Sequence, residues 1–301
     1  MVKIMKQDNF LHKSDDPLKN KNPLVSVIIP AYNEEGVIED CIKTLKNQTY
    51  KKIEIIFVDD GSTDRTLEIV NRFEEVKILK QNHQGPGNAR NLGAKNAKGE
   101  ILSFVDADMT FDKNFIQNLI KPIIEENEIG TIDGVQIALN QDNIWSKCWG
   151  RYFIERKSKY GWVYRAMMKN EFVKMGGFDS SLGYADDRTF FIKYNARSKR
   201  VKDAICYHKN AETLKEVFKQ SVWIGSSINQ KWIKIRGLNF LILLGTAIIF
   251  PIAIIPLSIN KSHKIKNFKV FFPWMIIFMS VRYVGMLKGI YRRIFYGWNF
   301  R

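Results

Sequence analysis

Two aspartates one residue apart, Asp106 and Asp108, follow an apolar stretch that begins at Ile101. We expect this stretch to be a strand that ends in the two carboxylates. Carboxylates at that spacing can converge on one hard divalent cation, with a diphosphate completing the oxygen shell. Such a pair also recurs by chance and often caps a turn, but its position after an apolar strand favours the metal.

A second pair of carboxylates, Asp59 and Asp60, precedes Gly61 after another apolar run. At a strand-to-helix turn a carboxylate can accept hydrogen bonds from a base or ribose, and glycine lets the backbone approach closely. An N-cap cluster is the alternative, and both roles can coexist. Arg90 follows in a glycine-rich segment, 84–91, that lacks the lysine and spacing of a phosphate loop. It suits a base or diphosphate oxygen, or else a surface salt bridge.

A third pair, Asp186 and Asp187, follows the motif GGFD at 176–179. One of these acids is a candidate general base. Adjacent acids raise each other's pKa, which favours proton acceptance near neutral pH. By spacing alone, a helix N-cap is an equal alternative. His208 follows the strand-like run AICYH, where a lone histidine is more often structural than a ligand.

The order of the expected elements brings these residues to one edge. Strands are expected at 24–30, 53–61, 76–82 and 100–108, and helices at 34–48, 63–75 and 87–97. This alternation predicts an α/β domain with a mostly parallel sheet and helices on both faces. Ligands of such sheets bind beyond the carboxyl ends of the strands. Polar clusters fall at those ends, at 32–34, 59–60, 82–84 and 106–108.

The basic charge is concentrated at one end of the chain. The 301 residues include 47 Lys and Arg against 31 Asp and Glu, but the last acidic residue is Glu216, and 13 of the basic residues follow it. This is a near-neutral domain with a basic, apolar tail. A nucleic-acid binder with a uniformly basic groove is therefore disfavoured.

The tail has the composition of a membrane-associated segment. Residues 213–236 predict an amphipathic helix, lying on a membrane surface or packed on the preceding domain. Residues 237–260 carry no charge and are long enough to cross a bilayer of roughly 30 Å, as a kinked span or re-entrant hairpin. A second apolar run, 270–281, is too short alone. We expect a polar tail at 1–22, a catalytic domain at 23–212, a juxtamembrane helix at 213–236 and a hydrophobic membrane segment at 237–301.

The remaining compositional signals concern the compartment. The three cysteines form no C-x-x-C pair, which favours a reducing environment over a disulfide framework. The first 22 residues lack the apolar core of a signal peptide, so we expect an unprocessed cytoplasmic N-terminus. With the basic tail, this predicts a catalytic domain on the cytoplasmic side of a membrane.

As a set, the motifs resemble the inverting family-2 glycosyltransferases. The matching runs, in the family's order and spacing over roughly 23–215, are VSVIIPAYNEE, IFVDDGSTD, GPGNARNLG, FVDAD, GGFD and ADDRTFF. The resemblance implies a GT-A-type fold, a nucleotide-diphosphate sugar donor, Mg²⁺ or Mn²⁺, and inversion. It also implies donor contacts from Pro30, Ala31, Tyr32, Glu34, Asp59, Asp60, Arg90 and Asp106.

The same resemblance gives roles to the acidic pairs. Asp106 and Asp108 would contact the metal, with His208 as a further ligand, and Asp187 would be the base. Asp186 stands where the family usually has Glu, which keeps the charge but shortens the side chain. The processive motif Gln-x-x-Arg-Trp lacks its arginine at 220–224, which favours transfer of one sugar to a lipid-linked or cell-surface saccharide.

Two alternatives stay open at this point. Polyprenyl-phosphate sugar synthases resemble the chain less, because they usually lack the GGFD and Glu-Asp region. A catalytically inactive, sugar-nucleotide-binding subunit of a membrane complex is disfavoured by the intact Asp106, Asp108 and Asp187.

Overall fold

A computed structural model describes residues 11–14, 18, 22–149, 153–155, 158–226, 255–256, 258 and 268–296. The chain divides into two compact units. The first comprises residues 1–137, 153–180 and 186–208, and the second comprises 138–152, 181–185 and 209–301.

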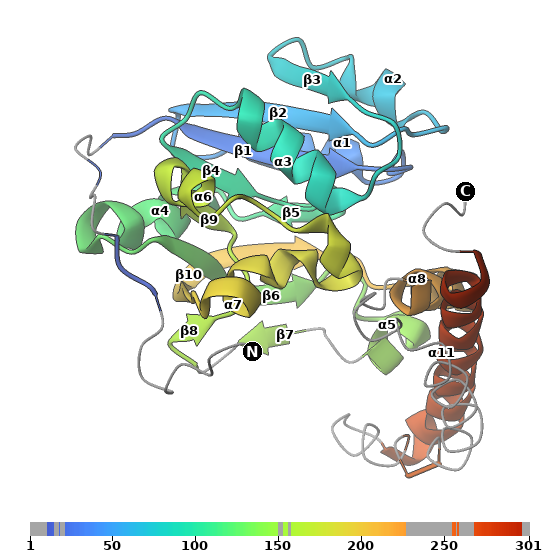
Figure 1. The fold of residues 1–301 in the computed structure, drawn as a ribbon. Coiled ribbons are helices and arrows are strands. Elements are labelled where there is room, and N and C mark those ends of the chain that lie inside the picture. Colours follow the sequence, from blue (N-terminus) through green and yellow to red (C-terminus); the bar gives the residue numbers. More distant parts are fainter. Residues whose placement is uncertain are drawn as a thin grey trace, which may run out of the picture. The chain divides into compact units, whose positions relative to one another are not determined.

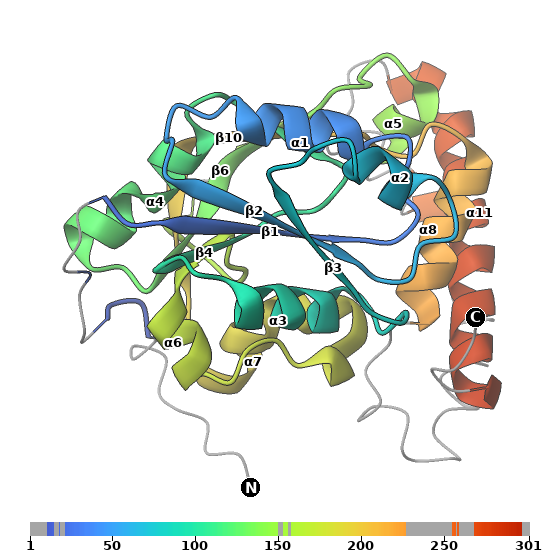
Figure 2. The same ribbon diagram turned by 90° about the horizontal axis from the view of Figure 1, so that it is seen from above.

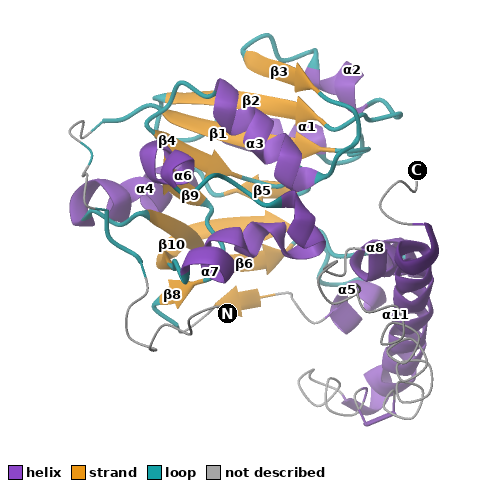
Figure 3. Cartoon of the chain, in the orientation of Figure 1, coloured by secondary structure: helices purple, strands orange, loops and turns teal. Residues whose placement is uncertain are grey.

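One mixed sheet forms the centre of the first unit (Figures 1 and 3). Its strand order is β3-β2-β1-β4-β9-β6-β10-β5, with β7 paired to β6 and β8 to β10. The strands are β1 Val25–Ala31, β2 Ile53–Asp59, β3 Val76–Lys80, β4 Ile101–Phe104, β5 Met109–Phe111, β6 Gly130–Ala138, β7 Phe153–Glu155, β8 Tyr160–Gly161, β9 Ala166–Met168 and β10 Ser198–His208.

The strands β3, β2, β1 and β4 are parallel, as predicted, but the rest of the sheet is not. β9 runs antiparallel to both β4 and β6, and β10 runs antiparallel to β5. The prediction of a mostly parallel sheet was therefore wrong. A parallel pair needs a long crossover, usually a helix. Helices supply such crossovers between the first four strands, which pair in parallel.

Helices cover both faces of the sheet, as Figure 2 shows. On one face lie α1 Ile38–Lys46 and α4 Phe115–Glu126, and on the other lie α3 Pro86–Asn96, α6 Lys169–Lys174 and α7 Thr189–Tyr194. Each face has its own buried apolar cluster. The first unit also contains α2 Thr66–Val70, and the 3₁₀ segment η1 Ser180–Arg188 includes residues of both units.

Several elements are shorter than the sequence predicts. The helix expected at 63–75 begins only at Thr66, where the Asp64 carboxylate accepts the backbone N–H of Thr66 at 3.0 Å. The helix expected at 34–48 begins at Ile38. The strand expected to end in Asp106 and Asp108 ends at Phe104, so these two acids lie in the turn that precedes β5.

The second unit is helical where it is described. Its helices are α5 Ile144–Trp149, α8 Leu214–Ser226 and α11 Phe268–Tyr296. Glycines bring α8 and α11 into close contact: a Cβ at Gly225 would lie 2.3 Å from the Met286 carbonyl oxygen, and one at Gly289 would lie 2.1 Å from that of Val222. Cys148, Val217 and Phe278 belong to the apolar core of this unit.

The predicted membrane segment, 237–301, is described only in part. The described residues include little of 237–260, and they stop at 226 within the predicted juxtamembrane helix. The second apolar run, 270–281, lies within α11. Among the helices that the structure describes, none is both long and apolar enough to cross a membrane. The expected hydrophobic membrane helix therefore has no support from this part of the chain.

Candidate active site

The ends of β1 and β2 bring the first predicted donor residues together. Ala31 is in register with Asp59, and the backbone N–H of Asp60 donates to the Ala31 carbonyl at 2.8 Å. Pro30 and Ala31 are buried, whereas Tyr32 is 41% exposed. The sequence thus places a tyrosine ring at the carboxyl end of the sheet with its backbone fixed by the neighbouring strand.

The loops after β1 and β2 are joined by side chains. Asn33, at a positive φ of 59°, donates its backbone N–H to the Ser62 hydroxyl at 3.0 Å. The backbone N–H of Glu34 donates to the Thr66 hydroxyl at 2.7 Å. In turn, the Asp59 carboxylate accepts the N–H of Ser62 at 3.1 Å. These bonds hold the predicted donor residues Glu34 and Asp59 in one rigid corner.

Asp60 is buried and surrounded by donors from the loop 81–85. One carboxylate oxygen accepts the backbone N–H of Gln84 at 2.8 Å and the side-chain amide of Gln81 at 2.6 Å. The other accepts the N–H of Gly85 at 2.9 Å and lies 2.9 Å from Nδ1 of His83. Asp60 therefore organises this loop, and its predicted contact with a nucleotide stays a prediction.

The same loop places a second ring beside Tyr32. The centroids of Tyr32 and His83 are 4.1 Å apart, with the rings tilted by 36°. Sequence reasoning included His83 only in a polar cluster. The position of His83 after the end of a strand was the one sign in the sequence that it could belong to the site. Its contact with Tyr32 is seen only in the folded structure.

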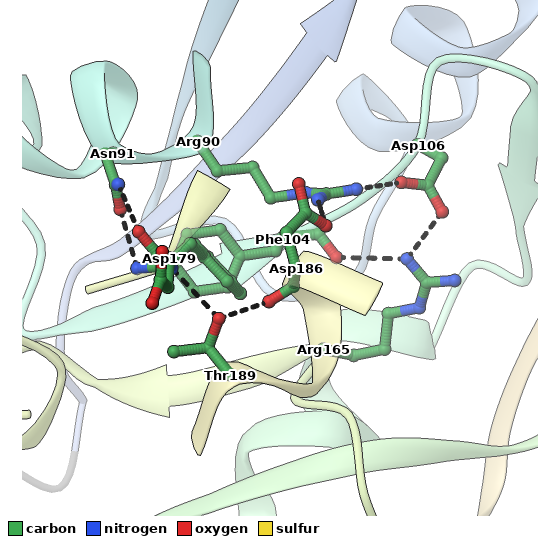
Figure 4. Close-up of polar contacts among 9 residues, drawn as sticks. Arg90, Asn91, Phe104, Asp106, Arg165, Asp179, Asp186 and Thr189 are labelled. Atoms are coloured by element: carbon green, nitrogen blue, oxygen red, sulfur yellow. Dashed lines mark hydrogen bonds and ion pairs between the residues drawn. The ribbon is translucent and has the colours of Figure 1, made fainter. Parts of the chain in front are cut away.

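Asp106 lies between two arginines (Figure 4). One of its oxygens is 2.9 Å from Arg90 Nη2, and the other is 2.9 Å from Arg165 Nη1. Burial alone would raise the pKa of Asp106, but the guanidinium groups of Arg165 and Arg90 outweigh it and hold that pKa well below its usual range. Asp106 is a carboxylate that stays ionised.

Arg165 is a residue of the candidate site that the sequence analysis missed. It precedes β9, and its Nε also lies 3.1 Å from the carboxylate of buried Asp133. Because β9 pairs with β4, Arg165 reaches the end of β4 and donates to the Phe104 carbonyl at 3.4 Å. It belongs to no motif of the sequence, so only the antiparallel pairing reveals it.

The acid pair after GGFD meets Arg90 from the other side. Asp186 is 4% exposed, with one oxygen 3.2 Å from Arg90 Nη1, and it also accepts the backbone N–H of Gly87. Burial raises the pKa of Asp186, and Arg90 opposes the rise. Asp186 thus contacts the first turn of α3 and the arginine that also binds Asp106.

The next residue, Asp187, has a different environment. Its Oδ1 is buried and has no hydrogen-bond partner among the described residues. Burial raises the pKa of Asp187, Asp186 adds to the rise, and Arg90 and Arg188 oppose it. A carboxylate with an unpartnered oxygen and a raised pKa can accept a proton.

The GGFD motif anchors this acidic segment. The side chain of Asn91 accepts the N–H of Phe178 at 2.9 Å and donates to its carbonyl at 2.8 Å. The Thr189 hydroxyl accepts the N–H of Asp179 at 2.9 Å and donates to the Asp186 carbonyl at 2.6 Å. Figure 4 shows these bonds beside the Arg90 and Asp106 contacts.

Asp108 and His208 lie on adjoining segments of the sheet. β10 pairs with β5 so that His208 is opposite Met109, the residue after Asp108. Part of the Asp108 side chain is exposed to solvent. The surrounding protein still removes much of the water around its carboxylate. This desolvation and the negative charge of Asp106 raise the pKa of Asp108 to about 6. The described residues contain no group of three or more His, Cys, Asp or Glu that could hold a metal ion.

These environments decide which residues suit a divalent cation. Asp108 fits, because a cation would favour its anionic form against desolvation and the repulsion of Asp106. Asp106 fits less well, since Arg90 and Arg165 already contact both of its oxygens.

Comparisons with known proteins identify the family of the chain. The sequence model of the family described as "Glycosyl transferase family 2" matches residues 26–183. The uncharacterized glycosyltransferase EpsJ of Bacillus subtilis (strain 168) is 28% identical over 220 residues, which cover 65% of this chain and 64% of that protein. The match to this relative spans just under two thirds of its length.

Two solved structures share the fold. A mannosyltransferase from Pyrobaculum calidifontis, in complex with GDP-Man and Mn²⁺, has a TM-score of 0.54 and 18% identity, covering 93% of this chain and 90% of that one. S. aureus TarS 1-349, in complex with UDP-GlcNAc, has a TM-score of 0.51 and 18% identity, covering 90% and 92%. The family match confirms the resemblance of the motifs, and the chain belongs to glycosyl transferase family 2, with a GT-A-like mixed sheet flanked by helices.

Proposed function

We propose that this chain transfers one sugar from a nucleotide-diphosphate sugar to a hydroxyl of a saccharide acceptor, with inversion at the anomeric carbon. The observation that carries the proposal is the pair Asp186 and Asp187 beside Arg90. Asp186 is held by Arg90, whereas Asp187 keeps a buried oxygen without a partner among the described residues.

The donor would lie at the carboxyl ends of β1, β2 and β4. Tyr32 offers an exposed ring there, and Asp59 offers a carboxylate whose position is fixed by Ser62. Pro30, Ala31 and Glu34 would line the same corner, and Asp106 would be near the ribose. Structural neighbours in complex with GDP-Man and UDP-GlcNAc support a nucleotide sugar as donor.

Asp187 would act as the general base. As the acceptor oxygen bonds to the anomeric carbon, the bond from that carbon to the diphosphate oxygen breaks, and the hydroxyl proton passes to Asp187. Attack opposite the leaving group inverts the configuration. Arg90, fixed between Asp106 and Asp186, supplies positive charge near the departing diphosphate.

We propose Asp108 as the main ligand of Mg²⁺ or Mn²⁺, with His208 nearby and Asp106 as a neighbouring charge. When bound, the cation would neutralise charge on the diphosphate. The Mn²⁺ in the Pyrobaculum neighbour supports this choice of metal.

We further propose that the chain works at the cytoplasmic face of a membrane, on a lipid-linked or cell-surface saccharide. The support is compositional: all residues after Glu216 are free of acids and include 13 Lys and Arg beside apolar runs.

A screen of nucleotide sugars tests the donor and the metal together. We expect one donor to be hydrolysed or to raise the melting temperature only with Mg²⁺ or Mn²⁺. The variant Asp108→Asn should lose this metal dependence, because an amide is a poorer ligand for a hard cation. Glu74→Gln, at an exposed position, is the matched control and should behave as wild type. Full activity in excess chelator would refute the metal assignment.

A further inference from the structure

A group of exposed and half-buried rings and cations lies on the first unit and starts next to the proposed base. We name it the basic aromatic face; it comprises Lys159, Tyr160, Trp162, Arg188, Phe191 and Arg197. Trp162 is 48% exposed, and its ring stacks on Phe191 with centroids 5.5 Å apart and planes 21° apart. Tryptophan side chains are mostly buried in folded proteins, so an indole with this much exposed surface is unusual.

Three cations of this face lie over rings. The Arg188 guanidinium is 5.6 Å from the centroid of Trp162, and that of Arg197 is 5.2 Å from the centroid of Phe191. The Lys159 ammonium is 5.3 Å from the centroid of Tyr160. Contact with a ring holds a cation in place, and Lys159 and Arg188 are also exposed to solvent.

The charge of the surrounding segment is one-sided. Residues 188–202 contain six Lys and Arg and no acidic residue, although residues 1–216 as a whole are nearly balanced. Within this segment, Lys193 lies 2.8 Å from Asp179, and Lys199 pairs with Glu126. Arg188 is exposed and lies over an indole. Arg188 and Arg197 of the basic aromatic face therefore belong to a locally basic segment of a unit whose charge is otherwise nearly balanced.

Rings and arginines together define the chemistry of a ligand. The C–H face of a sugar ring packs against an exposed indole, whereas a guanidinium recognises phosphate or carboxylate by two parallel hydrogen bonds. Arg188 directly follows Asp187, so a ligand bound along this face would extend from the proposed base.

We propose that the basic aromatic face is the acceptor subsite, and that the acceptor is a saccharide chain bearing anionic groups, phosphate or carboxylate. This inference rests on the proposed function, since it takes Asp187 as the base.

The test measures binding of labelled chains of equal length to the full-length protein by fluorescence anisotropy. The probes are poly(ribitol phosphate), hyaluronan and neutral dextran, at about 0.15 M salt to screen surface charge. We expect one anionic chain to bind at least about tenfold more tightly than dextran, a difference of roughly 1.4 kcal/mol. Which of the two binds decides between phosphate and carboxylate.

Variants localise that binding. Arg188→Gln and Trp162→Ala should each weaken it by about fivefold or more, and Arg188→Lys should restore part of the loss through charge alone. The controls, Lys51→Gln and Lys219→Gln, each remove one exposed charge elsewhere, the second from the basic C-terminal segment. Trp162→Phe, with a thermal melt of every variant, separates loss of the ring from loss of the fold.

Two results would overturn the proposal: equal affinity for all three chains, or a loss with Lys219→Gln as large as that with Arg188→Gln. Binding is measured without donor, so its failure is distinct from failure of the proposed function. An enzyme that hydrolyses a nucleotide sugar but ignores anionic chains would refute only this inference.

Discussion

Two adjacent aspartates, buried Asp186 and half-buried Asp187, differ in what surrounds their oxygens. Asp186 is 3.2 Å from Arg90 and accepts the N–H of Gly87, whereas Asp187 has a buried oxygen without a hydrogen-bond partner in the described part of the chain. A satisfied carboxylate positions its neighbours, and an unsatisfied one is available to a substrate. The chemistry of the pair is thus divided between a positioning residue and a proposed base.

Asp187→Asn tests this division. The amide has nearly the same shape but cannot take up a proton, so we expect kcat to fall by roughly 10²–10⁴ while donor affinity changes little. Single-turnover kinetics with titration of the donor separate the two quantities. An equal loss of donor affinity would instead make Asp187 a structural residue.

The pH dependence of the rate follows from the same environment. Burial raises the pKa of Asp187, and the base acts only when deprotonated. Activity should therefore be full above this raised pKa and fall as the pH drops through it, at a pH above the ordinary range of an aspartate. The acidic limb of kcat/KM against pH should move or vanish in Asp187→Asn. An unchanged limb would assign it to another group.

At the residue scale, motifs brought out several residues of the candidate site, because acids such as Asp59 and Asp106 lie at or just after strand ends. Asp106, Asp186 and Arg90, predicted from separate motifs, meet in the structure. Arg165 could not be predicted, because its contact with Asp106 depends on an antiparallel strand of three residues that carries no pattern of its own. Nor could the contacts of Asp60 with the loop 81–85, since backbone N–H groups leave no trace in the sequence.

The helix α3 positions Arg90, and its position depends on close packing against β1. A Cβ at Gly93 would lie 2.4 Å from Cγ2 of Ile28, a contact that the buried isoleucine cannot easily avoid. Gly93 belongs to the element that connects Arg90 with the sheet, so a shift here moves the site.

Gly93→Ala should therefore destabilise the fold, although alanine is the better helix former. Overpacking costs about 1–3 kcal/mol, against a gain of up to about 1 kcal/mol in helix propensity. We expect a lower urea midpoint and weaker donor binding. Gly36→Ala is the control, because a Cβ there meets nothing within 4 Å. Equal midpoints for the two variants would show that α3 can shift without loss.

At the element scale, the order of strands and helices up to β4 was predictable, because buried apolar runs alternate with amphipathic stretches. The strand expected at 100–108 is shorter in the structure and ends at Phe104. The prediction was too long because Val105 and Ala107 are apolar and buried, as strand residues are, although they lie beyond the strand. Beyond it, strands of two or three residues such as β8 and β9 are too short for periodicity to detect. Pairing with distant strands, which no local pattern records, decides their direction.

At the scale of the whole molecule, charge is distributed unevenly. Residues 1–216 are nearly balanced, and the 13 basic residues after Glu216 have no acid among them. In the second unit, Trp223, Trp274 and Tyr291 are exposed. Aromatic and basic residues together are typical of segments at the interface of an anionic membrane.

This composition predicts that the full-length chain binds membranes. The conditions that release the protein from the membrane distinguish interfacial attachment from a membrane span. Anionic lipids should strengthen binding to vesicles over zwitterionic ones, by about 1 kcal/mol for each basic residue near the surface, and salt should weaken that gain. Lys288→Gln with Arg292→Gln should reduce the gain, whereas Lys51→Gln, in the first unit, should not.

If attachment is electrostatic and interfacial, washing cell membranes with high salt or carbonate should release the protein. Retention after both washes would point to a span through 237–260 instead. Full-length protein recovered in the soluble fraction of lysed cells without detergent would refute attachment altogether, since neither arrangement permits it.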